Sequence, residues 1–344
     1  MLTIVMVFTK SNDLANKAIK SYEKLFESEL YHLEKVVVEN RFLESLKVGK
    51  FFPTFTFIFW PLTNTKFIAF LMHVFTKNLL NGYQGQIEKA IPDILLSIDP
   101  LTNAGLGKIA SEMKLDAGII LLTPFTIHQC QLLESNIKLF AVTNETREIL
   151  KRKNIKNVKK VSWPLVLSEL TFSCSCGKEI ILDQCKILTV CINLKDASTS
   201  HLKKVLKQLH NSCNLICIGN KKNHDRLQDF LTKNLIEVTF VSYAHRFHVL
   251  QIADFYVSQG DSESIFDAFI SFTIPFIIFP RDYKSYIASR YLKKQRLAES
   301  GDLKNLLLFE KKDMLIEFKK RGAEYTNSLQ IFSQELLSKE MFYE

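Results

Sequence analysis

Side chains that can move a proton follow two of the apolar runs in this sequence. Asp13 comes shortly after the run Met1–Phe8, and His128 ends the stretch Thr123–His128, which follows the run Ala117–Leu122. A carboxylate or an imidazole at the carboxyl end of a strand can act as a general base, and an imidazole can also hold a phosphate. A single loop histidine is as often only solvated. The sequence therefore offers two candidate bases, Asp13 and His128, and does not choose between them.

The elements that must position these residues alternate between strand and helix. In the first half, the apolar runs at residues 1–8, 93–99, 117–122 and 139–142 predict strands, and helical spacing of apolar residues follows the first run. The alternation restarts after a pause near residue 164, with further apolar runs from residue 187 to residue 279. Continuous apolar strands between helices indicate parallel sheets covered on both faces.

We therefore expect an α/β protein built from two doubly wound, Rossmann-like domains. The predicted domains are residues 1–164 and 165–320, and a last helical segment, 321–344, is expected to cross back to the first domain. Domains of this kind bind ligands at the carboxyl ends of their strands, so the expected site is a cleft between the two.

Composition narrows the function classes. The chain has 344 residues, of which 47% are hydrophobic, which excludes a disordered protein and is enough for two cores. Its net charge of +9 favours an anionic partner such as a nucleotide, a nucleic acid or an acidic membrane. The lysines are spread along the chain without a nucleic-acid-binding module, so no nucleic acid partner is expected. Glycine is scarce, at 11 residues where average usage gives about 24.

Cysteine usage and the amino terminus indicate the compartment. The seven cysteines form no regular framework, which favours a reducing environment. Cys174 and Cys176 lack the further ligands that a closed zinc site needs, so no metal is expected. The first residues are typical of a buried strand and not of a signal peptide, and no apolar run is long enough to span a bilayer. These features predict a cytoplasmic protein.

One aromatic and basic segment, residues 46–80, interrupts the alternation. It contains two short apolar runs separated by prolines and a polar tetrapeptide, with lysines among them. Such a segment can insert its aromatic side chains into the interface of an anionic membrane while the lysines meet the headgroups. The alternative is a plain pair of core helices. The candidate membrane or acceptor residues are Phe55, Phe57, Phe59, Trp60, Phe67 and Phe70.

Several motifs carry a resemblance to a known family. Ile216–Asn220 ends in a G-x-N turn, Gly260–Ala268 is similar to a G-x-x-T-x-x-E-A signature, and Ile274–Pro280 is similar to a P-x-x-x-x-P strand. In the first half, Thr123–His128 resembles a T-D-x-x-x-H loop. Together they resemble the GT-B glycosyltransferases. The branch concerned holds monogalactosyldiacylglycerol synthases, processive diacylglycerol glucosyltransferases and the peptidoglycan UDP-N-acetylglucosamine transferase.

The resemblance implies a site for a nucleotide-sugar donor in the second domain. The helix that begins after Gly260 would cradle a pyrophosphate with its backbone N–H groups, with Ser264 as the hydroxyl position. Asp267 would accept both ribose hydroxyls, unless it is an ordinary solvated helix charge. The backbone of Val238–Leu250 would meet the uracil ring. The donor-binding residues implied are Gly219, Asn220, Gly260, Ser264, Asp267 and Lys284.

The sequence also departs from the family pattern. The first turn, G-G-G-H-x-x-A in the family, is Lys10–Asp13 here, with Asn12 in place of the histidine. The glycine turn of the second domain becomes Asn193–Ser198, and the usual Q-x-x-N-A becomes Lys284–Ala288, where Lys284 can still meet a phosphate. These changes bear on turnover more than on fold.

Two functions are therefore predicted. The first is an inverting, metal-independent transfer of a hexose from a UDP-sugar to a membrane lipid such as diacylglycerol, on the inner face of a membrane and without a cofactor. Asp13 or His128 would deprotonate the acceptor hydroxyl, and helix N-termini with Lys284 would stabilise the departing diphosphate. The alternative is an impaired relative that binds membrane or nucleotide without turnover.

Overall fold

The computed structural model describes fifteen stretches of the chain: residues 2–10, 13–26, 31–39, 61–62, 64–99, 101–122, 125, 127, 129–132, 137–155, 158–161, 188–195, 198–280, 282–301 and 312–330. The chain divides into two compact units, one of residues 1–171 with 329–344 and the other of residues 172–328. We call them unit 1 and unit 2. The predicted domain boundary at residue 165 lies outside the described residues.

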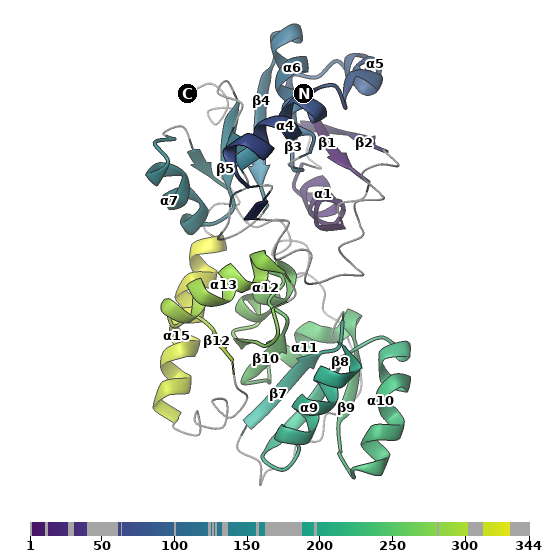
Figure 1. Ribbon diagram of the computed structural model, residues 1–344, viewed down its shortest axis with the longest axis vertical. Coiled ribbons are helices and arrows are strands. Elements are labelled where there is room, and N and C mark those ends of the chain that lie inside the picture. Colours follow the sequence, from purple (N-terminus) through teal and green to yellow (C-terminus); the bar gives the residue numbers. More distant parts are fainter. Residues whose placement is uncertain are drawn as a thin grey trace. The chain divides into compact units, whose positions relative to one another are not determined.

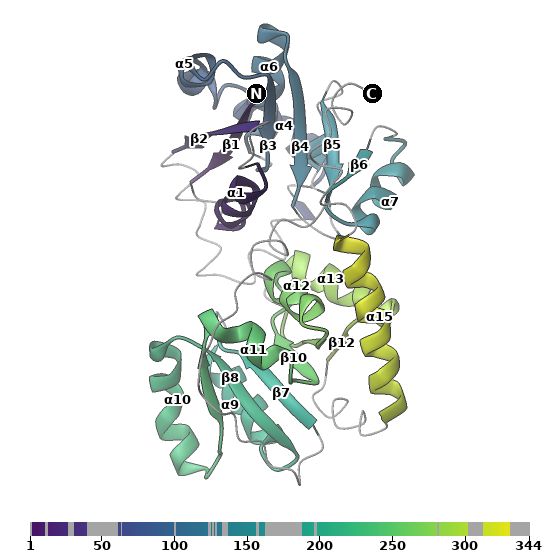
Figure 2. The same ribbon diagram turned by 180° about the vertical axis from the view of Figure 1, so that it is seen from behind.

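Unit 1 contains a parallel sheet of six strands in the order β2-β1-β3-β4-β5-β6. The strands are β1 (Leu2–Thr9), β2 (Tyr31–Val38), β3 (Ile94–Ser97), β4 (Asp116–Leu121), β5 (Lys138–Ala141) and β6 (Val158–Lys160). The helices are α1 (Asp13–Phe26), α4 (Lys66–Lys77), α5 (Gln84–Lys89), α6 (Asn103–Met113) and α7 (Asn144–Arg152). Helix α1 packs against β1 and β2, as Figure 2 shows. The short apolar strands are buried because helices cover the sheet.

Unit 2 repeats this plan with a second six-stranded parallel sheet, in the order β12-β11-β10-β7-β8-β9. Its strands are β7 (Leu188–Asn193), β8 (Cys213–Gly219), β9 (Thr239–Ser242), β10 (Phe255–Ser258), β11 (Ile274–Ile277) and β12 (Glu299–Ser300). Its helices are α9 (Thr199–Leu209), α10 (Lys221–Lys233), α11 (Arg246–Leu250), α12 (Ser262–Ile270), α13 (Tyr283–Lys294) and α15 (Lys312–Gln330). Side chains of α9, α10 and α15 pack on one face of the sheet, and those of α11 and α12 pack on the other. Figure 1 shows these helices around the strands of the sheet.

The predicted class, α/β with two doubly wound parallel sheets, is confirmed. Each strand expected from an apolar run in the described residues is present. Strand β12, which pairs with β11, was not among the predicted strands. That strand has two residues, Glu299 and Ser300, so it carries no apolar run to signal it.

The scarcity of glycine is visible at the ends of helices. Helices often end with a residue in the left-handed region, where glycine is usual because it has no Cβ. Here Leu235 after α10 (φ 53°) and Phe272 after α12 (φ 56°) take that place. The backbone N–H of Thr273 then donates to Ala268 O at 2.9 Å, and that of Ile236 donates to Leu231 O at 3.0 Å. Both helices therefore end in complete capping motifs with a strained residue where glycine is favoured.

Candidate functional site

The strand order of unit 2 brings two loop starts together. The chain runs from β7 outward through β8 and β9, then returns to the other side of β7 to form β10 and β11. The register pairs Val257 of β10 with Ile192 of β7, so Asn193 and Ser258 lie at one edge. Ligands of open α/β sheets bind at such a reversal of strand order, outside the carboxyl ends of the strands. This edge of unit 2 is therefore the candidate site.

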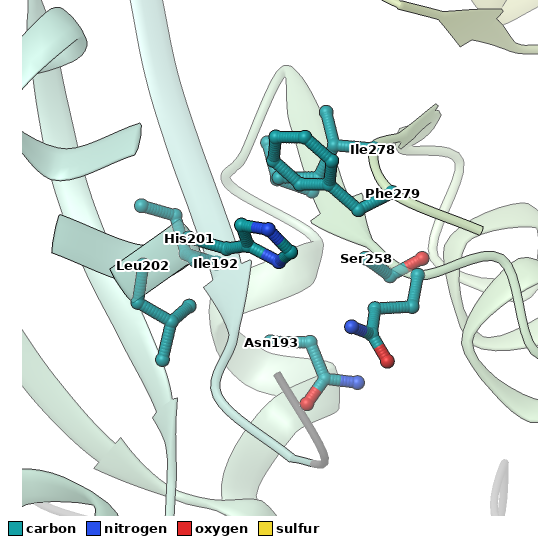
Figure 3. Close-up of a pocket in the computed structure, with 9 residues that line it drawn as sticks. Ile192, Asn193, His201, Leu202, Ser258, Ile278 and Phe279 are labelled. Carbon is teal, nitrogen blue, oxygen red and sulfur yellow. The ribbon is translucent and has the colours of Figure 1, made fainter. Parts of the chain in front are cut away.

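A pocket lies at this reversal. It is lined by Ile192, Asn193, His201, Leu202, Val257, Ser258, Gln259, Ile278 and Phe279. The imidazole of His201, from α9, stacks on the ring of Phe279, which follows β11, with centroids 4.0 Å apart and planes 12° apart (Figure 3). The remaining space is about 10 Å³, room for one water molecule. A ligand ring can enter only if this aromatic pair opens.

The predicted pyrophosphate cradle at the start of α12 already holds a carboxylate. Asp261 caps the helix, accepting from the Ser264 backbone N–H at 3.0 Å and from the Ser264 hydroxyl at 2.6 Å. The Asn193 amide donates to the same hydroxyl at 3.0 Å. The Asp261 cap therefore engages one of the backbone N–H groups that an anion at this helix start would use, and places a carboxylate where a phosphate is expected to bind.

Gly260 forms the turn before this helix and is closely packed. Its φ is +77°, in the left-handed region, and a Cβ added there would lie 2.6 Å from Cγ2 of Ile277. Its backbone N–H donates to the Ser258 hydroxyl at 3.2 Å. A glycine is required at this position for both reasons, and it fixes the path of the chain between the pocket and α12.

Asp267 is buried and not a solvated helix charge, so that alternative was wrong. Its side chain is 5% exposed and accepts from Arg246 Nε at 2.8 Å. The Tyr243 hydroxyl lies 3.1 Å from Glu263 and 3.3 Å from Asp267. Burial first, and then the Asp267 carboxylate, raise the pKa of Tyr243 well above its usual value, so the phenol stays protonated and donates. Recognition of a ribose by Asp267 would require this network to rearrange.

The Arg246 guanidinium is held from two sides. Its Cζ lies 4.4 Å from the ring centroid of Tyr243 and 4.3 Å from that of Phe247. The side chain is 7% exposed. The resemblance implied that the surrounding segment meets the uracil ring, and Arg246 was not among the predicted site residues. An arginine four residues after the end of β9 carried no signal by itself.

The other predicted donor-binding residues lie near the same edge. Gly219 ends β8, and Asn220 caps α10 in a reciprocal capping box with Asn223. Lys284 lies in the first turn of α13, which Asp282 caps by accepting from the Ser285 N–H at 2.8 Å. Their parts in donor binding remain predictions. Asn193, His201, Gln259 and Phe279 were missed, because only the strand order brings them together.

In unit 1, the candidate bases are less fully described. Asp13 begins α1 directly after β1, as expected, but its side chain and the whole of His128 lie outside the described residues. The sheet reverses between β1 and β3, where Asp99 is 3% exposed. Asp99 accepts from the Thr9 backbone N–H at 3.3 Å and from the Leu101 N–H at 3.0 Å. The strand-ending carboxylate in the sequence was the signal that could have found it.

Helix α4 presents an unusual apolar surface. Five large side chains at helical spacing are exposed: Phe67 (68%), Phe70 (54%), Leu71 (48%), Val74 (51%) and Phe75 (66%). The expectation of a plain core helix is therefore wrong for α4, which buries only its opposite side, including Ala69 and Thr76. The described residues include no helix long and apolar enough to cross a bilayer. Phe55, Phe57, Phe59 and Trp60 lie outside the described residues.

Comparisons with known proteins bear on the fold. No protein-family profile and no curated protein matches the sequence. Among solved structures, a UDP-glucosyltransferase from Polygonum tinctorium is 10% identical, with a TM-score of 0.67 over 100% of this chain and 99% of that one. Acinetobacter baumannii MurG is 10% identical, with a TM-score of 0.62 over 99% of both chains.

The same architecture also serves another reaction class. A Listeria monocytogenes protein assigned as a UDP-N-acetylglucosamine 2-epimerase is 12% identical, with a TM-score of 0.58 over 98% of this chain and 95% of that one. Likeness at this level of identity shows the fold and not the activity. The chain has the GT-B fold, with two Rossmann-like domains.

Proposed function

We propose that this protein transfers a hexose from a UDP-sugar donor to a membrane lipid such as diacylglycerol, with inversion and without a metal. The observation that carries the proposal is the pocket at the strand reversal of unit 2, in a chain with the GT-B fold. That position is where open α/β sheets bind nucleotides and related ligands. The likeness to two structures of nucleotide-sugar-dependent transferases supports it.

The proposed reaction is a single displacement. Asp13 or His128 takes the proton of the acceptor hydroxyl, and the hydroxyl oxygen bonds to the anomeric carbon of the sugar. The bond from that carbon to the diphosphate oxygen breaks, and the diphosphate leaves with the electron pair. Lys284 is the proposed cation that meets the leaving diphosphate, because it lies in the first turn of a helix at the carboxyl edge.

The acceptor is proposed to be a lipid because of the exposed stripe on α4. Each of its five side chains is about half exposed, so inserting one of them contributes about 1 kcal/mol and the stripe about 5 kcal/mol. Lys66 and Lys77, at the two ends of the helix, complement an anionic headgroup layer. The protein is therefore proposed to act as a peripheral protein on the inner, anionic face of a membrane.

A vesicle assay tests the membrane part of the proposal. Replacing Phe67 and Phe75 by serine removes the two most exposed side chains of the stripe, at a cost of about 2 kcal/mol or roughly thirtyfold in affinity for phosphatidylglycerol vesicles. Ile316→Ser, in α15, is the matched control because Ile316 is 63% exposed but lies in unit 2. Equal vesicle binding by both variants would contradict a membrane role for α4.

A product assay tests the transfer itself. The protein is incubated with diacylglycerol vesicles and with UDP-glucose, UDP-galactose or UDP-N-acetylglucosamine, and lipids are analysed by mass spectrometry. We expect a glycolipid whose mass exceeds that of the acceptor by one hexose residue. Absence of a glycolipid with all three donors would overturn the proposal.

One structural observation favours the second function, binding without turnover. Asp261 already occupies the N-terminus of α12, and Asp267 is already paired with Arg246. Under this alternative UDP raises the melting temperature but no product forms. Asp261→Asn keeps a good helix cap and removes the charge, so it should bind UDP more tightly than the wild type. Asp229→Asn, on the exposed side of α10, is the control for the same change of net charge.

A further inference from the structure

The pocket of unit 2 contains two polar atoms that the fold does not satisfy. Oε1 of Gln259 and Nδ1 of His201 are both shielded from solvent, and neither has a hydrogen-bond partner in the part of the chain that the structure describes. Leaving a buried polar atom unpaired costs about 1–3 kcal/mol, so such atoms at a pocket indicate a missing partner. By contrast, the Asn193 amide in the same pocket is satisfied by Lys195 N and Ser264 Oγ.

The character of the walls limits what that partner can be. Ile192, Leu202, Val257 and Ile278 provide an apolar lining, and Phe279 provides an aromatic face that already carries a parallel ring. Apolar walls with a few placed polar groups are typical of sites for small cyclic ligands. Because the His201 ring covers the face of Phe279, a ligand ring can use that face only after the imidazole has moved (Figure 3).

The charges around the pocket are also informative. Among the residues that the structure describes, no lysine, arginine, aspartate or glutamate lines it. The Asp261 carboxylate is connected to it through Ser264 and Asn193. Glu263, on the same helix, is already paired with Lys195 Nζ at 3.3 Å. A carboxylate on a ligand would find no lysine or arginine among the described lining residues and would lie near the Asp261 carboxylate, which is costly in a site shielded from water.

We infer that this pocket holds the sugar ring of the donor and selects a neutral hexose over a hexuronic acid. The inference rests on the proposed function and names the substrate class of its donor site. Gln259 and His201 bind hydroxyl groups, which can both donate and accept, and the apolar face of the ring packs on Phe279. The selectivity comes from Gln259, His201 and the uncharged lining, none of which the sequence analysis identified.

Calorimetric titration tests this with UDP, UDP-glucose, UDP-galactose and UDP-glucuronate. We expect the wild type to bind at least one of the neutral sugar nucleotides at least tenfold more tightly than UDP-glucuronate. Gln259→Ala should weaken binding of that neutral sugar nucleotide about tenfold and leave the affinity for UDP unchanged. Gln228→Ala, on the exposed side of α10, is the matched control and should change neither. The unchanged affinity for UDP also shows that the variant is folded.

The outcomes separate this inference from the proposed function. Equal affinity for neutral and acidic sugar nucleotides, or an equal loss for UDP and UDP-sugar in Gln259→Ala, would overturn the sugar pocket while leaving nucleotide-sugar binding intact. The expected discrimination without any glycolipid product would support the pocket and overturn the transfer. No binding of any sugar nucleotide by the wild type would overturn both.

Discussion

The buried ion pair between Arg246 and Asp267 gives the sharpest test of how unit 2 is held together. Both side chains are almost fully buried, at 7% and 5% exposure, and Nε lies 2.8 Å from Oδ2. Removing one partner of such a pair leaves an uncompensated charge in the interior and costs about 3–5 kcal/mol. Arg246→Met also loses the contacts of the guanidinium with Tyr243 and Phe247. We therefore expect a loss of about 4 kcal/mol.

Urea unfolding followed by circular dichroism measures this loss. With a slope of about 2 kcal/mol per molar urea, 4 kcal/mol lowers the midpoint of the affected transition by about 2 M. The double variant Arg246→Met/Asp267→Leu should recover most of the stability, because removing both charges removes the desolvation cost of each. This recovery distinguishes an unpaired charge from a simple packing defect.

A surface pair in the same unit provides the control. Arg321 donates to Glu317 at 2.7 Å, a similar distance, but these side chains are 40% and 47% exposed. Solvent screening reduces such a pair to about 0.5 kcal/mol or less, so Arg321→Met should hardly move the midpoint. If Arg246→Met costs no more than Arg321→Met, the argument that the first pair is desolvated is refuted.

Three further predictions concern stability. Leu235→Gly should raise the free energy of unfolding in urea by about 0.5–1 kcal/mol, because glycine relieves the positive φ, whereas Leu235→Ala should not. Equal effects of the two substitutions would contradict the strain. Gly260→Ala should lower the free energy of unfolding in urea by about 2–3 kcal/mol, because the added Cβ would meet Ile277 and the φ at this position is +77°. Gly82→Ala is the control, because a Cβ added at Gly82 meets open space. Equal losses in the two variants would contradict the prediction. Burial raises the pKa of Cys217 to about 12, so the stability that the protonated thiol contributes is complete below about pH 8.5 and is lost as the pH rises toward 12. By pH 10 the free energy of unfolding in urea should fall by about 2 kcal/mol more for the wild type than for Cys217→Val. Parallel pH profiles of the two proteins would refute this.

Part of the candidate site could be predicted from local pattern. Gly219, Asn220, Gly260 and Ser264 lie at strand ends or helix starts, as expected, because turn and capping residues act on their own chain neighbours. The state of Asp267 could not be predicted in this way. Its partner Arg246 is 21 residues away, and a helix carboxylate looks the same in the sequence whether it faces water or a guanidinium.

The aromatic surface of α4 shows the same division. The sequence indicated an aromatic and basic segment, but core and surface helices can share that composition. The exposure of the side chains shows that α4 is a surface helix, because the stripe from Phe67 to Phe75 lies on the side of the helix that faces away from the core. The low glycine content can likewise be counted in the sequence. Only the backbone conformation shows that Leu235 and Phe272 take positive-φ positions at helix ends where glycine is usual.

The sequence by itself determined the two α/β units, because the alternation of apolar runs and amphipathic helices is a local property that survives without knowledge of any contact. The tertiary structure alone decided the site. Strand order placed β10 beside β7, which brought Gln259, His201 and Phe279 around one pocket. It also paired Asp267 with Arg246, 21 residues away. Such pairings join residues far apart in the chain, and the spacing of apolar residues along the sequence does not predict them.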